Sequence, residues 1–479
     1  MKKRYTSFWM TLTAAAMMSL TSCDLIEPGD TVNPNVTDSD FLNAPNAMHT
    51  WVNGTEKNFA VAMGTYCQLL EIASDNYYNN YTRSNRDFDR HVFMPSDEDV
   101  QVLQRYVGNL RESVDYGLKT VIKHDPNITP AEHFRLAVIK TFSHILAGET
   151  FTGLPDENGG KVIAWQEHLN RGLACADSAL YWANADSARA LAHTLKARLY
   201  YRLGEATQAV EEARQALTQA PEMLEQVQFD GANNVNNVAQ EAIWGNWFQP
   251  LPRLDFLDPK YFQTKSTEQR PVTIAKAEEN YLIIAEAQAS AGQIDDAKST
   301  LRQLLTLVKS RPVAHGIDDH LEGRYNGGSK HYPDGSLYRV AASPADSLRS
   351  NLVLDRQQPH LIDIPYISGT SVTPPMIESC GTEDAALELI YLLRQEIFFG
   401  EGRRMADLGM RMPVCDIEAA HTASAKGYDT AVIPSFIPAG SGLDDFTMDE
   451  SKHEVVITYN MNRVIVENKH SQYVVPFVK

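Results

Sequence analysis

The sequence has little positive charge. Its 43 lysine and arginine residues stand against 61 aspartate and glutamate residues, which gives a formal net charge of −18. No run of basic residues occurs beyond the first four positions. Proteins that bind nucleic acid need clustered lysine and arginine side chains to neutralise phosphates. The sequence therefore disfavours nucleic acid as a partner.

Long hydrophobic runs are also missing beyond the N-terminus. Residues 8–20 are apolar or small, but a stretch of roughly 13 residues is too short for a bilayer core that needs about 20. Lys2, Lys3 and Arg4 precede it, and this order of charge and apolar residues is typical of a secretory signal peptide. The sequence thus predicts export, with residues 1–22 as the signal peptide.

Cysteine is scarce, with five residues in 479. Cys67, Cys175, Cys380 and Cys415 are widely spaced and form no CxxC pair, which argues against zinc-ribbon or thioredoxin-like chemistry. Disulfide bonds and buried free thiols are both compatible with this spacing. We favour buried thiols in a helical core.

Catalytic motifs are missing as well. The chain has no HExxH, GxSxG, P-loop or strand-linked GxGxxG pattern. Gly400-Glu401-Gly402 lacks the third glycine of a nucleotide-binding loop, and we expect it inside a helix. Acidic pairs are too numerous to single out a glycosidase pair. The sequence predicts no catalytic residues, no metal site, no cofactor and no enzymatic activity.

The end of the signal segment carries a recognisable site. Leu20-Thr21-Ser22-Cys23 resembles a bacterial lipobox, in which the cysteine is acylated and becomes the new N-terminus. Acyl chains anchor a protein to a membrane without a transmembrane helix. Residues 24–43 are rich in Pro, Asp, Asn and Thr and are interpreted as a tether. We expect residues 44–479 to form the binding domain.

Most of the chain between residues 48 and 412 has apolar residues every three or four positions, which predicts amphipathic helices. Thr129-Pro130 is typical of a helix start. Two segments, near 187–221 and 276–310, follow the pattern of a tetratricopeptide repeat. Each places a turn glycine between small helix residues, at Gly204 and Gly292. Such glycines allow the left-handed turn between two antiparallel helices.

Residues 387–411 provide the most specific pattern. It comprises an Arg-x-Glu step, a Glu-Gly-x-Arg step and an Asp-Leu pair, carried by Arg394, Glu396, Glu401, Gly402, Arg403 or Arg404, Asp407 and Leu408. A Tyr-Leu-x-x-Ala-Glu-Ala helix precedes it at residues 281–287. Together with the lipobox and the repeats, these motifs resemble SusD/RagB-type nutrient-uptake lipoproteins of Bacteroidetes. In the resembling family the segment 387–411 is scaffold, and we expect helical ion pairs there, such as Arg404 with Asp407.

The resemblance implies a mostly α-helical fold with tetratricopeptide-type hairpins and an irregular, loop-rich ligand face. It also implies a surface-exposed lipoprotein of the outer membrane that acts as the lid of a SusC-like TonB-dependent transporter. The default ligand is a glycan. Three alternatives remain open: a RagB-like oligopeptide binder, a periplasmic tetratricopeptide scaffold and a lipid-anchored hydrolase.

The chain departs from the family pattern in two places. Residues 148–155, Gly-Glu-Thr-Phe-Thr-Gly-Leu-Pro, only weakly match the usual Tyr-Gly-Asp-x-Pro loop. Residues 453–479 alternate between apolar and polar residues, which predicts a short C-terminal β-hairpin turned by Asn460-Met461-Asn462. We expect variable loops over 311–386. These departures leave the ligand undefined.

Aromatic residues interleaved with amides are the best candidates for ligand contact, because sugar faces pack on rings while hydroxyl groups need polar partners. Residues 74–90 hold one such cluster, a Trp-Gly-Asn-Trp-Phe segment at 244–248 a second, and the loop 324–338 a third. The alternative is that these aromatic residues belong to the core. The candidate ligand-binding residues are Tyr77, Tyr78, Asn79, Asn80, Tyr81, Arg83, Trp247 and Tyr332.

Overall fold

A computed structural model describes residues 38–80, 85–245, 247–265, 267–318, 330–355, 361–439 and 442–478. The predicted signal peptide, Cys23 and the candidates Tyr81 and Arg83 lie outside the described residues. In the described part of the chain, no helix is both long and apolar enough to cross a bilayer.

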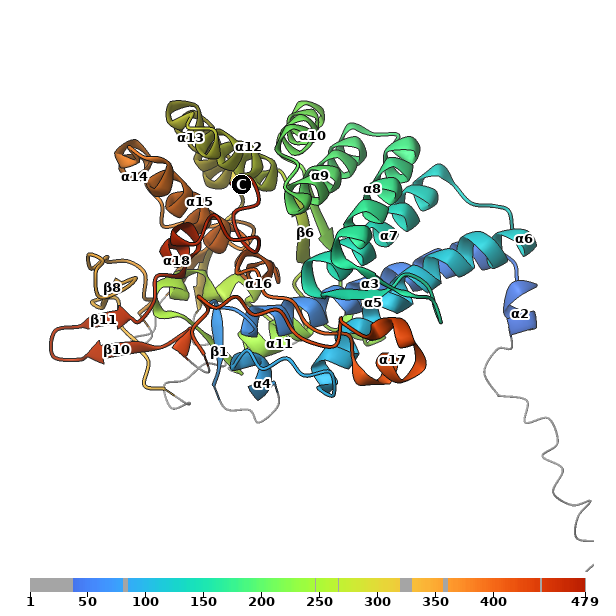
Figure 1. The fold of residues 1–479 in the computed structure, drawn as a ribbon, viewed down its shortest axis with the longest axis horizontal. Helices are drawn as coiled ribbons and strands as arrows, with labels where there is room; N and C mark the ends of the chain where they lie inside the picture. The colour runs from blue at the N-terminus through green and yellow to red at the C-terminus, as the bar shows by residue number, and fades with distance from the viewer. Residues whose placement is uncertain are drawn as a thin grey trace, which may run out of the picture.

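Helices dominate the structure (Figure 1). The α-helices are α2 (Asp38–Leu42), α3 (Ala47–Ile72), α4 (Arg86–Asp89), α5 (Glu98–Tyr116), α6 (Ile122–His124), α7 (Pro130–Thr150), α8 (Trp165–Trp182), α9 (Asp186–Leu203), α10 (Ala206–Gln219), α11 (Val238–Ile243), α12 (Glu278–Ser290), α13 (Ile294–Ser310), α14 (Pro374–Ser379), α15 (Glu383–Ile397), α16 (Arg404–Asp407), α17 (Asp416–His421) and α18 (Met461–Glu467). Tighter or wider helical turns are η1 (Gly117–Val121), η2 (Gly231–Asn233), η3 (Pro252–Tyr261) and η5 (Ala423–Ala425).

Short strands are paired in small sheets. They are β1 (Tyr77–Asn79), β2 (Gly153–Pro155), β3 (Val162–Ala164), β4 (Leu224–Val227), β5 (Phe248–Pro250), β6 (Val272–Lys276), β7 (Ala314–Asp318), β8 (Arg339–Ala341), β9 (Leu361–Ile364), β10 (Phe446–Asp449) and β11 (Glu454–Ile457). The two-stranded pairs are β1–β5, β2–β3, β4–β6 and β7–β9, and a three-stranded sheet has the order β10-β11-β8.

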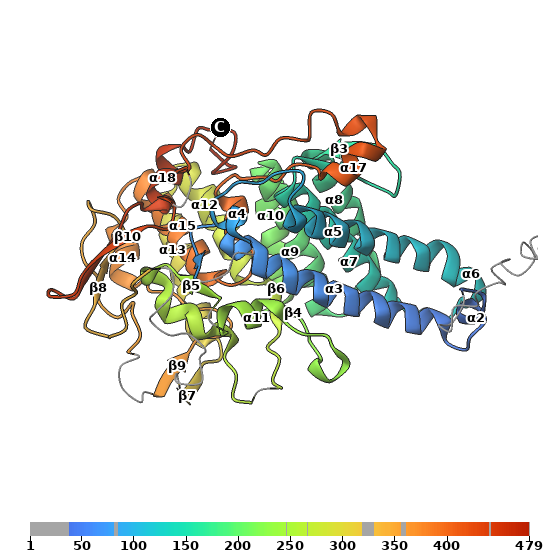
Figure 2. The same cartoon turned by 90° about the horizontal axis from the view of Figure 1, so that it is seen from below.

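Helices α7 to α10 and α12 to α15 stand side by side in an arc, and the long helix α3 runs beneath them with α5 and α11 (Figures 1 and 2). Local chemistry explains the elements of the arc. Thr129 caps α7 by accepting from the Glu132 N–H, while the Glu132 carboxylate accepts from the Thr129 N–H. Gly204 ends α9 at φ 75°, and Gly292 lies between α12 and α13 at φ 74°. The predicted hairpins and the mostly α-helical fold class are confirmed.

The C-terminal hairpin exists, but its predicted residues are wrong. β10 pairs with β11 in antiparallel register, Phe446 opposite Ile457, and residues after Asn460 form α18 instead of a second strand. The Asn460 side chain accepts from the Arg463 N–H and so starts that helix. Met461, Ile465 and Val466 are all buried, a spacing that fits one face of a helix.

The charged motif residues of the segment 387–411 are buried, and their hydrogen-bond partners differ from those that the sequence predicted. Arg394 binds Asp407 through two hydrogen bonds of 3.0 and 2.8 Å. Arg404 does not pair with Asp407; it donates to Asp75, 329 positions away, at 2.6 and 2.9 Å. Gly400 and Gly402 lie between α15 and α16 with positive φ angles, so the expectation that they lie inside a helix is wrong.

The four cysteines of the described region are free thiols, and three of them, Cys67, Cys380 and Cys415, are buried. This confirms the interpretation as buried thiols for those three, while Cys175 is only partly buried.

Candidate functional site

Pairing of β1 with β5 brings two of the predicted ligand segments together. Tyr78 lies opposite Gln249 and Asn79 opposite Phe248. Beyond the paired strands, the Asn80 N–H donates to the Trp247 carbonyl oxygen at 2.8 Å. The candidates in residues 74–90 and 244–248 therefore form one continuous structure, although about 170 positions separate them in the chain.

The third predicted segment joins them through Phe446 of β10. The Phe446 ring lies 6.3 Å from the Tyr78 ring and 6.1 Å from the Tyr332 ring, measured between centroids. We call these three rings, Tyr78, Tyr332 and Phe446, the aromatic junction. The Tyr332 hydroxyl donates to Asp255 on η3 at 3.1 Å, and the Tyr78 hydroxyl donates to Gln249 at 2.7 Å.

Lys330 brings a positive charge to the aromatic junction. Its Nζ lies 4.6 Å from the centroid of the Tyr78 ring and 5.7 Å from that of Phe446, within the range of a cation–π interaction. The same ammonium group bonds to Asp445 Oδ1 at 2.9 Å and to the Asp444 carbonyl oxygen at 3.2 Å. Lys330 and Phe446 are both half-buried, so they form the solvent-accessible part of the junction.

Two carboxylates beside Lys330 are easier to protonate than ordinary ones. Burial raises the pKa of Asp444 to about 7, with repulsion from Asp89 and Asp445 adding to the shift and Lys330 opposing it. Burial also raises the pKa of Asp89 to about 6, although this carboxylate accepts the Asn79 N–H at 2.9 Å. Charge at the junction therefore changes across neutral pH.

The expectation of exposed tyrosines is wrong for most of the described candidates. Tyr77 is a core residue whose ring stacks on Phe399, with centroids 4.8 Å apart. Tyr78, Asn80 and Tyr332 are also buried. Tyr77 and Tyr78 point to opposite faces of β1, and both are buried because Phe399 covers one ring and Phe446 the other, which composition did not reveal.

Two described candidates remain accessible. Trp247 is 41% exposed, whereas its neighbours Trp244 and Phe248 are buried, so the alternative that this segment belongs to the core holds for those two. Asn79 is partly exposed at the end of β1. Contact of either residue with a ligand stays a prediction.

Sequence reasoning missed Lys330, Asp444 and Phe446. Lys330 lies in the third predicted segment, 324–338, but was not among the candidates, whereas Asp444 and Phe446 lie outside all three segments, and Phe446 is 368 positions from Tyr78. The only local signal is the Asp444-Asp445-Phe446 triplet, which combines charge with an aromatic ring. Only tertiary contacts identify it as part of a site.

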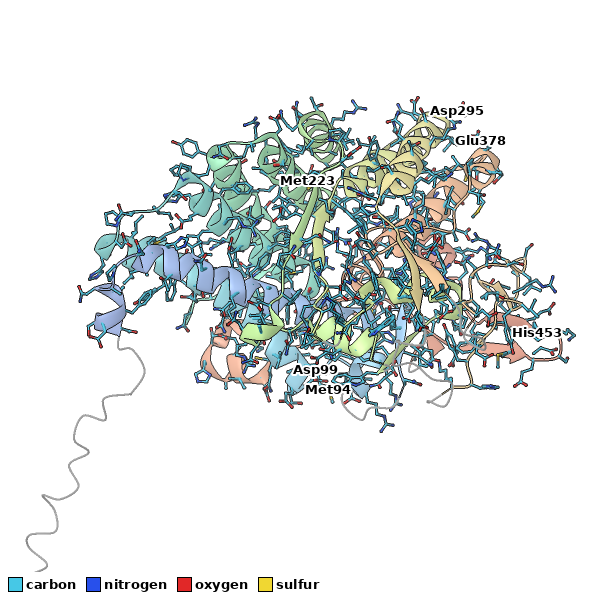
Figure 3. All side chains as sticks on the ribbon, turned by 180° about the vertical axis from the view of Figure 1, so that it is seen from behind. Met94, Asp99, Met223, Asp295, Glu378 and His453 are labelled. Atoms are coloured by element: carbon cyan, nitrogen blue, oxygen red, sulfur yellow. The ribbon has the colours of Figure 1, made fainter. Side chains whose placement is uncertain are left out.

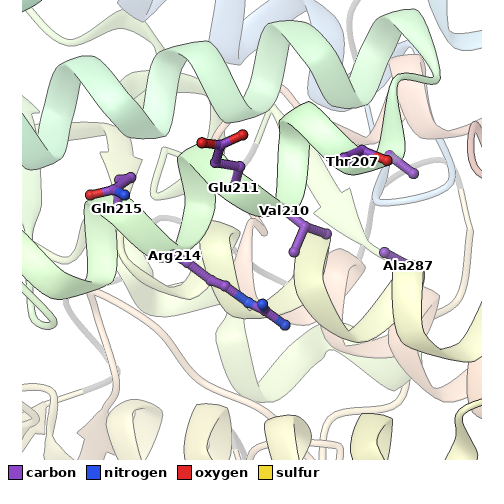
Figure 4. A pocket seen from close by; sticks show the side chains of 7 residues that line it. Thr207, Val210, Glu211, Arg214, Gln215 and Ala287 are labelled. Atoms are coloured by element: carbon purple, nitrogen blue, oxygen red, sulfur yellow. The ribbon is translucent and has the colours of Figure 1, made fainter.

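Two pockets away from the junction differ in the residues that line them. An open pocket of about 470 Å³ lies between α10 and α12, where Val210, Arg214 and Ala287 line it (Figure 4). A second, of about 530 Å³, lies between α5, β2 and α17 and is lined by amides and by Arg111. Within the described ranges, no group of three or more His, Cys, Asp or Glu residues could hold a metal ion.

Comparison with known proteins gives a likeness of fold. No family model matches the chain, and no curated protein matches it. A SusD superfamily protein from Bacteroides fragilis aligns with a TM-score of 0.50 at 13% identity, over 80% of this chain and 99% of that one. A SusD-like carbohydrate-binding protein from Bacteroides vulgatus has a TM-score of 0.49 at 11% identity, over 75% of this chain and 82% of that one.

Proposed function

We propose, on the premise that the chain has the SusD-like fold, that it captures a nutrient oligomer at the cell surface and passes it to a transporter. The observation that carries the proposal is the convergence of three aromatic and amide-rich segments on one junction. Each segment combines aromatic rings with amide or charged side chains, which is the chemistry that sugar binding needs. A glycan is the ligand class that this chemistry favours.

The ligand surface is the accessible rim of the aromatic junction. Trp247 offers an exposed indole on which the apolar face of a sugar ring can stack, and stacking of this kind needs a rigid aromatic group. Asn79, Lys330 and Asp445 provide amide, ammonium and carboxylate groups at the junction. The buried tyrosines support the rim through the Tyr78–Phe446 and Tyr332–Phe446 packing instead of contacting the ligand.

Delivery is the second part of the proposal. Acylation of Cys23 anchors the protein in the outer membrane, and the chain acts as the lid of a SusC-like TonB-dependent transporter. The protein binds its ligand and does not cleave it.

Protease added to intact cells should digest a surface protein, whereas protection from the protease would favour the periplasmic scaffold. The tagged lipoprotein should co-purify with such a transporter from detergent-solubilised membranes. Purification of the lipoprotein without any transporter would contradict the lid.

The ligand class can be decided by direct binding. Neutral oligosaccharides and a peptide pool are titrated against the purified chain by calorimetry, and Trp247→Ala is compared with the parent. We expect at least a tenfold loss of oligosaccharide affinity, because loss of a stacking aromatic costs on the order of 1–3 kcal/mol.

The matched control is Tyr181→Ala, which removes a 79% exposed aromatic residue from α8, well away from the junction. Equal affinity in all three proteins would contradict the assigned surface. Binding of peptides alone would favour the RagB-like alternative, and release of shortened oligomers would favour the hydrolase.

A further inference from the structure

A cavity of about 540 Å³ is lined by residues of η3, α14, α15 and α18 and of the loop after β8. Its size is within the range of small-molecule sites, which occupy about 300–1,000 Å³. Met376, Leu389 and Leu392 contribute apolar groups, and Ser347, Asn460 and Asn462 contribute polar groups. The charged residues that line it are Arg253, Asp346, Arg349 and Glu388.

Arg253 is a buried cation without an anion. Its side chain is only 9% exposed, yet among the described residues no group accepts a hydrogen bond from its guanidinium and no carboxylate lies within ion-pair distance. Three more deeply buried arginines pair with carboxylates, Arg394 with Asp407, Arg404 with Asp75 and Arg198 with Glu149, and Arg111 donates to two backbone carbonyl oxygens. An unpaired buried charge is costly unless something outside the chain compensates it.

Arg349 adds a second positive charge to the same cavity. Its guanidinium donates to the Ser371 carbonyl oxygen at 2.7 Å and, within the part of the chain that the structure describes, pairs with no carboxylate. Burial lowers the pKa of Arg253; attraction to Asp75 and Glu396 opposes this shift, and repulsion from Arg404 and Arg349 adds to it. Two like charges that face one cavity favour an anion between them.

The carboxylates nearby are already occupied. Glu396 accepts from the Thr370 hydroxyl and from the Ser371 N–H and hydroxyl. Asp75 binds Arg404. Asp346 and Glu388, which also line the cavity, both pair with Arg463.

One amide in the cavity lining also lacks a partner. Asn462 is buried, its Nδ2 donates to Gln395 and its Oδ1 has no hydrogen-bond partner. The cavity lining therefore holds two arginines and an amide that form no ion pair within it, while its two carboxylates, Asp346 and Glu388, are paired with Arg463.

We propose that this cavity binds a small molecule that carries a carboxylate, with Arg253 and Arg349 on the carboxylate and the apolar groups of Met376, Leu389 and Leu392 against its apolar part. The planar guanidinium fork matches a carboxylate through two parallel hydrogen bonds. The site is separate from the aromatic junction: Arg253 and Asp255 lie two positions apart on η3, but Asp255 accepts from Tyr332 and does not line the cavity.

The test uses pairs of probes that differ only in charge. D-glucuronate and N-acetyl-leucine are titrated by calorimetry against the purified chain, with D-glucose and N-acetyl-leucine amide as uncharged counterparts and inorganic phosphate as a separate probe. We expect at least one acid to bind tenfold tighter than its counterpart, with affinity that falls as salt rises. If both acids bind as weakly as their uncharged counterparts, the proposal is wrong. If phosphate alone binds, the assignment of a carboxylate ligand is wrong.

Variants then locate the binding. Arg349→Gln and Arg253→Met should each abolish the preference for the acid, while Arg302→Gln, which removes an exposed arginine paired with Glu378 on α14 (Figure 3), should keep it. Retention of the preference in both cavity variants would contradict the site. Arg349 is only half-buried, so its variant tests the proposal even if Arg253→Met folds poorly. Glycan capture depends on Trp247 and anion binding on the two arginines, so either proposal can fail alone.

Discussion

Two regions of the molecule hold buried arginines in different ways. Around α15 and α16, Arg394 and Arg202 share Asp407, and Arg404 binds Asp75. In the cavity beside η3, Arg253 makes no ion pair with a described residue, and at the aromatic junction the buried carboxylate of Asp444 lies 3.5 Å from the Lys330 ammonium group. The paired arginines hold distant segments in one arrangement, whereas Arg253 remains available for a ligand.

The sharpest way to break this comparison is to replace one arginine from each region. Arg404→Met should destabilise the protein by about 3–5 kcal/mol, because it leaves Asp75 buried without its ion-pair partner. Arg253→Met should change the free energy of unfolding by less than about 1 kcal/mol, because no ion pair is lost. Urea denaturation measures both values.

Arg302→Met provides the surface control for these two variants, with an expected effect below about 1 kcal/mol. Similar losses for Arg404→Met and Arg253→Met would show that both arginines are structural, and the distinction between the two regions would fail.

The pH dependence of stability should differ between two buried carboxylates, Asp407 and Asp444. Asp407 has a pKa lowered to about 2, because arginines 394 and 202 outweigh its burial. Its contribution to stability is therefore present above the unfolded pKa near 4 and is lost as the pH falls towards 2. Asp444 behaves in the opposite way. Its pKa is raised to about 7, so the folded state holds more protons than the unfolded state between about pH 4 and 7, and stability falls as the pH rises.

Asp444→Asn tests that sign. The variant should remove part of the decline in stability between pH 5 and 8, on the order of 2 kcal/mol at pH 8, with melting temperatures measured across that range. Asp384→Asn, on the exposed start of α15, is the control and should leave the pH profile unchanged. An identical decline in the Asp444 variant would show that this carboxyl group does not titrate there.

The smallest expected effects concern the turns of the arc. Gly204→Ala places a side chain at φ 75° and should cost about 1–2 kcal/mol. Gly54→Ala lies on the exposed face of α3, where an added Cβ meets nothing within 4 Å, and should stabilise by about 0.5–1 kcal/mol. Thermal unfolding of both variants measures the difference. Equal effects would mean that tertiary packing, and not the local turn, forms the α9–α10 hairpin.

Local signals predicted the helical part well. Thr129-Pro130 begins α7, and Gly204 and Gly292 each turn a hairpin, because caps and left-handed turns depend on residues a few positions apart. The prediction of a C-terminal strand after Asn460 was wrong. The alternating pattern suggested a strand, but the Asn460 side chain caps the helix α18.

The candidate site was predicted only in its parts. Composition selected Tyr78, Trp247 and Tyr332 as candidates, and the structure joins their segments, yet it buries two of the three. Lys330 lies in a predicted segment but was not itself predicted, and Phe446 lies outside all three segments. Whether an aromatic residue lies on a surface or in a core depends on strand pairing between distant segments, which no short pattern encodes.

The sequence by itself determined the helical hairpins, the lack of recognisable catalytic motifs, and the acidic balance that disfavours nucleic acid. Only the tertiary structure decided which charges are paired: Arg404 meets Asp75 from 329 positions away, and Arg253 meets no carboxylate among the described residues. Helix formation depends on neighbours along the chain. The pairing of a buried charge depends on which segments fold against it, and that choice separates the scaffold from the cavities that can take a ligand.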